Sequence, residues 1–324
     1  MKRPVLLLRA LLVLAGIALL VCPCPATATT KQSPLPAEAG EQKLHVLCTT
    51  FPIYQITRNL TQGRDQVQVG LMIPAQLGCP HDYALTPQDM RRLARADLLV
   101  VNGLGLEEFL GAPLKQANPN LTVIDSSQGV SELLPYTAGK DEESLGHDDH
   151  QGVNPHLFVS PRLVAKITLT IARELARVDP AGEELYRQNG ETYAQRMERL
   201  SAEVVAVGQR LKNKRIITQH GVFDYLARDL GVEVVAVVQA HAGQEPSAAE
   251  MIAIIKTAKE KKAGAIFSEP QYPARVPMTI AKEAGIKAAT LDPVASGSED
   301  APLAYYETVM QENLKTLQTT LGVE

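Results

Sequence analysis

The sequence has no excess of positive charge and no concentrated basic segment beyond its first residues. Its 32 lysines and arginines are scattered among 36 aspartates and glutamates, which leaves a formal net charge of −4. Proteins that bind nucleic acid need a concentrated basic surface to neutralise phosphates. This composition therefore argues against a nucleic-acid partner.

Long apolar runs are also scarce. The longest near the N-terminus, residues 10–22, follows a positively charged start but is shorter than the roughly 20 residues that span a bilayer. Its form is typical of a signal peptide, and Ala26-Thr27-Ala28 provides a small-x-small cleavage pattern. We therefore expect residues 1–28 to be removed and the mature protein to be periplasmic.

Lipid attachment at Cys22 is an alternative for the same segment. Leu19-Leu20-Val21-Cys22 resembles part of a lipobox, although Val21 stands where a small residue is expected. Both interpretations place the protein outside the cytoplasm.

Cysteine is rare, and cleavage would leave only Cys48 and Cys79. In an oxidising compartment an isolated pair can form a disulfide. Two separate, partly buried thiols are the other possibility, and the spacing of the two residues does not decide between them.

Short apolar runs alternate with helical patterns from residue 43 onward, which predicts an α/β fold with parallel sheets. Strands are expected at 45–48, 67–73, 98–101, 121–124, 216–218, 232–238, 265–267 and 288–291. Helices are expected at 52–60, 86–95, 106–110, 222–229, 247–261, 274–283 and 304–317. The order of elements in the first part repeats in the second, so we predict two lobes of similar design.

A long helix is expected to join the two lobes. Asp179-Pro180 is typical of a helix start, and apolar residues then recur at steps of three, four and seven. The stripe consists of Tyr186, Tyr193, Met197, Leu200, Val204, Val207 and Leu211. The predicted organisation is a signal peptide at 1–28, a flexible tether at 29–42, an N-terminal lobe at 43–178, the linking helix at 179–212 and a C-terminal lobe at 213–324. A long helix inside one larger domain is the alternative.

Four metal-type side chains occupy related positions in the two predicted lobes. His81, His220 and Asp292 each follow a predicted strand, and His156 lies in the loop that closes the first lobe. Ligands of open α/β sheets bind beyond the carboxyl ends of the strands. We therefore predict that His81, His156, His220 and Asp292 hold a metal ion together.

The chain resembles the periplasmic metal-binding proteins of ABC importers for zinc and manganese, over nearly all of its length from residue 43. The motifs that carry the resemblance are Thr49-Thr50-Phe51-Pro52-Ile53, Cys79-Pro80-His81, Val101-Asn102-Gly103-Leu104-Gly105-Leu106-Glu107, Asn154-Pro155-His156, His220-Gly221-Val222-Phe223-Asp224-Tyr225-Leu226, Glu245-Pro246-Ser247, Ser268-Glu269-Pro270 and Leu291-Asp292-Pro293. The resemblance implies two α/β lobes joined by one long helix, with the same four ligands between them. It also implies an ABC permease in the membrane as partner, for a protein that we expect to be a monomer.

Two positions depart from the pattern of that family. Cys79 and Asn154 each stand two residues before a predicted ligand, where the family usually has aspartate. Cys79 is open to three interpretations: an additional soft ligand, a disulfide partner of Cys48, or a bystander. An acidic segment at 141–150 contains His147 and His150, and it is either a short metal-gathering loop or a solvated surface loop.

The predicted ligand set favours zinc as the bound metal. Three imidazoles and one carboxylate suit Zn²⁺, whereas oxygen-rich sets favour Mn²⁺. Manganese, or less readily ferrous iron, is the alternative.

A zinc hydrolase is a rival interpretation, because three histidines and a water form a catalytic site. Asp292 would occupy the position that such a water needs, and the sequence has no HExxH motif or nucleophile elbow. We therefore expect a binding protein and not an enzyme.

Overall fold

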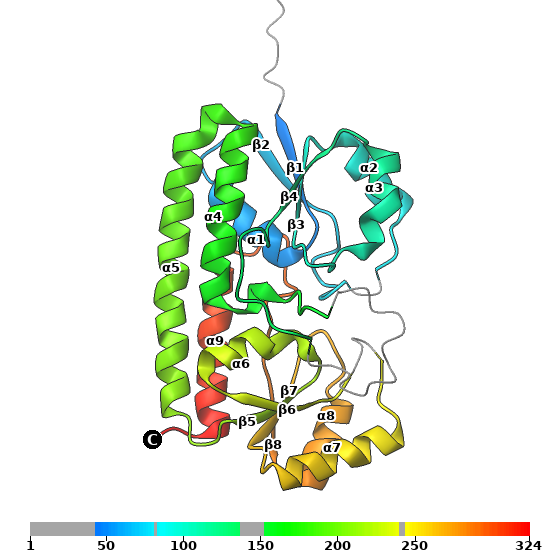
Figure 1. Cartoon of the computed structure of the whole chain (residues 1–324), viewed down its shortest axis with the longest axis vertical. Helices are drawn as coiled ribbons and strands as arrows, with labels where there is room; N and C mark the ends of the chain where they lie inside the picture. Colours follow the sequence, from blue (N-terminus) through cyan, green and yellow to red (C-terminus); the bar gives the residue numbers. More distant parts are fainter. Residues whose placement is uncertain (1–42, 81–82, 137–151, 240–243) are drawn as a thin grey trace, which may run out of the picture. The chain divides into compact units, whose positions relative to one another are not determined.

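Two parallel four-stranded sheets organise the protein (Figure 1). The computed structural model describes residues 43–80, 83–136, 152–239 and 244–324, all of them within one compact unit. The first sheet has the order β2-β1-β3-β4, and the second has the order β6-β5-β7-β8. The strands are β1 (Leu44–Cys48), β2 (Val67–Leu71), β3 (Leu98–Val101), β4 (Thr122–Asp125), β5 (Arg215–Thr218), β6 (Glu233–Val237), β7 (Ala265–Ser268) and β8 (Lys287–Thr290). The prediction of two lobes with parallel sheets is confirmed.

Helices follow the strands of each sheet in the order that the sequence predicts. In the first lobe they are α1 (Phe51–Thr61), α2 (Pro87–Arg95) and α3 (Gly111–Ala117), and in the second α6 (Asp224–Leu230), α7 (Ala248–Glu260), α8 (Arg275–Ala284) and α9 (Tyr305–Leu321). Thr86 starts α2 with a capping box, because its hydroxyl accepts from the N–H of Asp89 while the Asp89 carboxylate accepts from the N–H of Thr86.

The helix predicted at 106–110 was wrong in its extent. A 3₁₀ turn at Glu108–Leu110 leads directly into α3, which continues to Ala117. Pro113 lies in the first turn of α3. Proline is tolerated there because the N–H that it lacks would have no partner in that turn.

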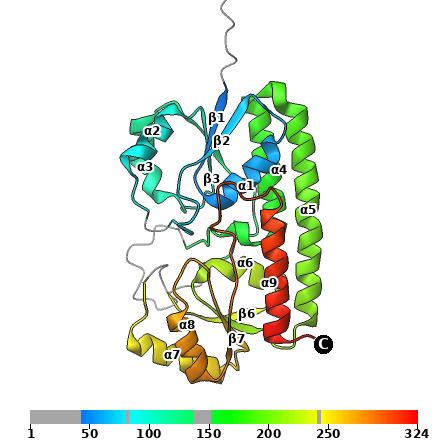
Figure 2. The ribbon, with the colours of Figure 1, turned by 180° about the vertical axis from the view of Figure 1, so that it is seen from behind.

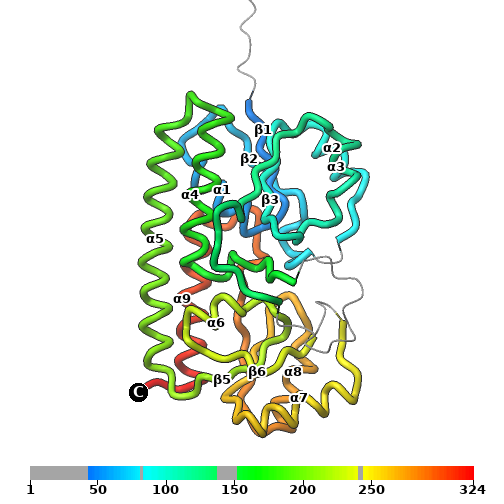
Figure 3. Tube along the Cα trace, viewed as in Figure 1, coloured from blue at the N-terminus to red at the C-terminus, as the bar shows by residue number. Residues whose placement is uncertain are grey.

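The linking helix is α5 (Glu183–Arg210), preceded by a 3₁₀ turn at Pro180–Gly182. With 28 residues it is about 42 Å long. All seven residues of the predicted apolar stripe are buried. Figure 3 shows α5 running beside both sheets.

Another helix, α4 (Pro161–Val178), packs along α5 and was not predicted. Its start carries clear signals, because the Ser160 hydroxyl accepts from the N–H of Leu163 and Pro161 occupies the first turn. Figures 1 and 2 show α4 and α9 each lying along α5, at one edge of the molecule's described part. The domain boundaries given above stay a prediction.

Contacts from α9 and the segment before it tie the second lobe back to the first. Arg58 and Asn59 of α1 donate to the carbonyls of Ala301 and Leu303, and Arg196 of α5 forms an ion pair with Glu307 of α9. One apolar cluster includes side chains of both sheets and of α4, α5 and α9. These contacts favour small relative shifts of the two sheets over a wide opening.

Among residues 43–80, 83–136, 152–239 and 244–324, no helix combines the length and the apolar character that crossing a bilayer requires.

Glu107 anchors the carboxyl end of the first sheet. Its buried carboxylate accepts from the hydroxyl of Thr49, at 2.6 Å, and from the N–H groups of Asn102 and Gly103, at 2.7 and 3.1 Å. The Asn102 amide in turn donates to the carbonyl of Pro155, at 2.9 Å. Burial is the main cause that raises the pKa of Glu107 from 4.5 to about 7.

This raised pKa predicts how pH affects stability. A carboxyl whose pKa is higher in the folded protein binds more protons there, so its contribution to stability is present at low pH and is lost between about pH 4.5 and 7. In urea unfolding, the free energy of unfolding of the wild type relative to Glu107→Gln should fall by up to about 3 kcal/mol across that range.

The matched control is Glu108→Gln, which alters the exposed neighbouring carboxylate. Its difference from the wild type should stay nearly constant over the same pH range. A constant difference for Glu107→Gln as well would contradict the raised pKa.

Candidate metal site

His220 follows β5 and is completely buried at the carboxyl end of the second sheet. Its Nδ1 lies 2.5 Å from Oε1 of Glu269, which directly follows the neighbouring strand β7. The N–H of Glu269 donates to the side chain of Gln219, and the amide of Gln271 donates to the second Glu269 oxygen. This carboxylate is therefore fixed on both sides, and it fixes the ring of His220.

His156 precedes the 3₁₀ turn at Leu157–Val159 and is also completely buried. Its Nδ1 lies 2.7 Å from Oδ1 of Asn154, which also accepts from the N–H of His156. The Asn154 amide nitrogen donates to the carbonyl of Gly221, at 2.7 Å, and to Oδ2 of Asp224, at 3.0 Å. Because this nitrogen is the donor, the facing Oδ1 accepts, and the His156 Nδ1 must carry the proton.

This arrangement explains why asparagine suits position 154. The side chain must donate to the buried carboxylate of Asp224 and accept from His156 at the same time. An aspartate would set two buried carboxylates against each other, at a cost in electrostatic energy. Asn154 thus links a ring of the first lobe to the start of α6 in the second.

The rings of His156 and His220 meet at an angle of 79°, with their centroids 5.4 Å apart. Cys79, from the segment between β2 and α2, joins them. One ligand-type atom from each of the three residues lies within 4.8 Å of the other two, and all three residues are buried. In neutral rings whose Nδ1 carries the proton, Nε2 is the nitrogen that binds metals.

Aromatic side chains surround the two histidines. Tyr136 and Phe158 pack against His156, with centroids 6.0 and 5.8 Å away, and Tyr272 packs against His220 at 5.9 Å. An apolar shell of this kind limits the access of water and strengthens electrostatic interactions with a bound cation.

The structure places two of the four predicted ligands together. His81 lies outside the described residues, as do His147, His150 and His241. Asp292 follows β8, as predicted, but is not part of the group formed by Cys79, His156 and His220. Its Oδ1 accepts from the N–H of Val294, at 2.7 Å, and burial raises the pKa of its carboxyl. The four-ligand set stays a prediction.

The sequence did not identify Glu269 as a partner of His220. The available signal was its position, because Glu269 directly follows the strand that pairs with β5 in the second sheet.

The two cysteines of the described chain do not form a disulfide. Cys48 and Cys79 are both free thiols.

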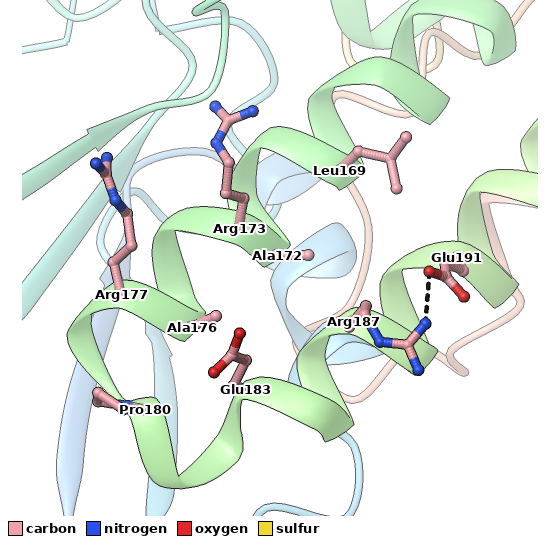
Figure 4. A pocket seen from close by; sticks show the side chains of 9 residues that line it. All are labelled: Leu169, Ala172, Arg173, Ala176, Arg177, Pro180, Glu183, Arg187 and Glu191. Atoms are coloured by element: carbon pink, nitrogen blue, oxygen red, sulfur yellow. Dashed lines mark hydrogen bonds and ion pairs between the residues drawn. The ribbon is translucent and has the colours of Figure 1, made fainter.

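A separate pocket of about 460 Å³ lies between α4 and α5 (Figure 4). Its charged lining consists of Arg173, Arg177 and Arg187 with Glu183 and Glu191, and Arg187 pairs with Glu191 at 2.8 Å. The lining contains no histidine or cysteine, and its excess of positive charge disfavours a metal cation.

A family model matches most of the chain. Residues 46–320 match the model described as zinc-uptake complex component A periplasmic, ZnuA.

Two curated relatives and one solved structure share this similarity. The high-affinity zinc uptake system protein ZnuA of Bacillus subtilis is 30% identical, over 97% of this chain and 98% of the relative. The zinc-binding lipoprotein AdcA of Streptococcus pneumoniae is 28% identical over 88% of this chain, which spans only 57% of that relative's length. The solute-binding protein FpvC of Pseudomonas aeruginosa, in complex with Mn²⁺, is 31% identical with a TM-score of 0.72, over 86% of this chain and 98% of FpvC.

The Glu269 contact predicts an effect on metal affinity. Glu269→Gln keeps the shape of the side chain but removes the charge that raises the basicity of the His220 ring. Affinity for Zn²⁺ should fall by about 10- to 100-fold, which is the usual effect of changing a residue that hydrogen-bonds to a metal-binding histidine. Competition with a chromophoric chelator measures this, and Glu283→Gln, at an exposed site on α8, is the control that should leave affinity unchanged. Equal affinities for both variants would contradict the role of Glu269.

Proposed function

This chain belongs to the zinc-uptake complex component A periplasmic family, and we propose that it captures Zn²⁺ outside the cytoplasm and delivers it to an ABC-type permease. The observation that carries the proposal is the pair of buried histidines, His156 and His220, contributed by opposite lobes. Each ring is fixed through Nδ1 by a side chain of its own lobe, Asn154 or Glu269. Orientation of this kind is typical of histidines that bind metals through Nε2.

The proposed ligands include His81 and Asp292 beside these two histidines. Asp292 occupies the carboxyl end of β8, the edge of the second sheet at which His220 also lies. A bound cation would favour its ionised form and offset the cost of burial, which raises its pKa. His81 follows Cys79 by two residues in the sequence, and its membership of the ligand set rests on that spacing and on the family resemblance.

Zinc is the proposed metal because a set of three imidazoles and one carboxylate suits it better than it suits manganese. The zinc-uptake and zinc-binding names of two relatives support this choice. The manganese complex of FpvC is the observation that favours Mn²⁺ as the second candidate.

The export signal at 1–28, the tether at 29–42 and the monomeric state belong to the same proposal. The family's description as periplasmic supports export, and its description as a component of an uptake complex supports a membrane partner. The matched family and relatives are uptake and binding proteins, so the chain is a binding protein and not an enzyme.

Contacts along α4, α5 and α9 support a particular mode of capture and release. Because these helices hold the two sheets along one edge, small shifts between the lobes can change the distances between ligands of opposite lobes. Such shifts would alter the affinity for metal without a wide hinge motion.

Removing a ligand should nearly abolish tight binding. His220→Ala takes away one imidazole and leaves the buried Glu269 carboxylate without its ring partner. Affinity for Zn²⁺ should fall by about 100-fold or more. This loss exceeds the one expected when only a residue that hydrogen-bonds to a metal ligand is changed. Isothermal titration calorimetry of the metal-free protein measures this.

The matched control is His45→Ala, which removes an exposed histidine of β1 in the first lobe. It should bind Zn²⁺ like the wild type. Wild-type affinity in the His220→Ala protein would show that metal binds elsewhere and would reject the site.

A further inference from the structure

Cys79 is grouped with His156 and His220 at the candidate metal site. It belongs to the segment between β2 and α2, and only 8% of it is exposed. Its sulfur is one of the three ligand-type atoms that lie within 4.8 Å of one another, the other two belonging to His156 and His220. Both cysteines of the described chain are free thiols, so no disulfide occupies this sulfur.

The spacing of these atoms is close to that of a bound zinc ion. With Zn–S near 2.3 Å and Zn–N near 2.0–2.1 Å, two ligands of a tetrahedral site stand about 3.3–3.6 Å apart. The group must therefore contract by at most about 1.5 Å to close around an ion. Side-chain rotations or a small shift between the lobes can provide that contraction.

A buried cysteine is often a small apolar filler, and Cys48 provides the comparison within this chain. Cys48 lies in the middle of the first lobe's core, at the end of β1, and is not part of the group. Cys79 belongs to the same apolar cluster, but its sulfur also lies within 4.8 Å of ligand-type atoms of His156 and His220. Both thiols are buried, but only the thiol of Cys79 lies next to potential metal ligands.

We propose that Cys79 is a direct ligand of the metal, so that the site combines a thiolate with the imidazoles of His156 and His220. This inference rests on the proposed function and specifies its donor set. Binding forms a metal–sulfur bond and releases the thiol proton to solvent. A soft sulfur donor favours Zn²⁺, and disfavours Mn²⁺, beyond what imidazole alone would do.

Cobalt provides a direct test, since Co²⁺ occupies zinc sites and a thiolate ligand gives it an intense near-ultraviolet charge-transfer absorption. The metal-free wild type is titrated with Co²⁺ and its spectrum compared with those of Cys79→Ser and Cys48→Ser. The wild type and Cys48→Ser should show this band at one equivalent. Cys79→Ser should bind Co²⁺ without the band, and its preference for Zn²⁺ over Mn²⁺ should fall by about tenfold or more.

The outcomes separate this inference from the proposed function. Stoichiometric Co²⁺ binding by the wild type without the band would overturn the thiolate ligand and leave the proposed function intact. A band that persists in Cys79→Ser would also overturn it. Failure of the wild type to bind Co²⁺ or Zn²⁺ would overturn both. The wild-type spectrum needs no variant, so the test does not depend on whether Cys79→Ser folds.

Discussion

The meeting of two buried histidine rings from opposite lobes is the interaction on which the rest of this structure depends. Burying two imidazoles side by side is costly unless each polar nitrogen has a partner. Asn154 and Glu269 meet that need at Nδ1 and at the same time fix the direction in which each Nε2 points. The same contacts that make the burial tolerable therefore prepare the rings to bind a cation.

Contacts around the site hold the rings of His156 and His220 in their relative positions. On the first lobe, Glu107 holds Asn102, whose amide supports the carbonyl of Pro155 next to His156. Asn154, also in the first lobe, donates to Gly221 and Asp224 at the start of α6 in the second lobe. The long helices α4 and α5 then hold the two sheets along one edge. A metal site that spans two lobes gains affinity from such preorganisation, because little freedom is left to lose on binding.

Much of the fold was accessible from sequence because it depends on periodic patterns. The alternation of strands and helices predicted both parallel sheets, and the stripe from Tyr186 to Leu211 predicted α5. The helix α4 was missed although Ser160 and Pro161 mark its start. The helix predicted at 106–110 ends where α3 begins, and Gly111 and Pro113 in the first turn of α3 are poor helix formers that give little signal for it.

The site was only partly accessible from sequence, for a physical reason. Strand ends identify which residues share an edge of a sheet, and His220 and Asp292 do follow β5 and β8 of the second sheet. Hydrogen-bond partners such as Asn154 and Glu269 depend on side-chain directions that no spacing encodes. The grouping of Cys79 with the two histidines likewise arises from the path of the segment after β2, so the sequence left its role open.

The central claim is that this chain binds a single transition-metal ion and prefers zinc. Native mass spectrometry of the metal-free protein, exposed to equal concentrations of Zn²⁺ and Mn²⁺, tests it most directly. The account predicts one tightly bound ion per chain, zinc, which also displaces manganese from protein loaded with manganese beforehand. A protein that stays metal-free, or that retains manganese in the presence of zinc, would contradict it.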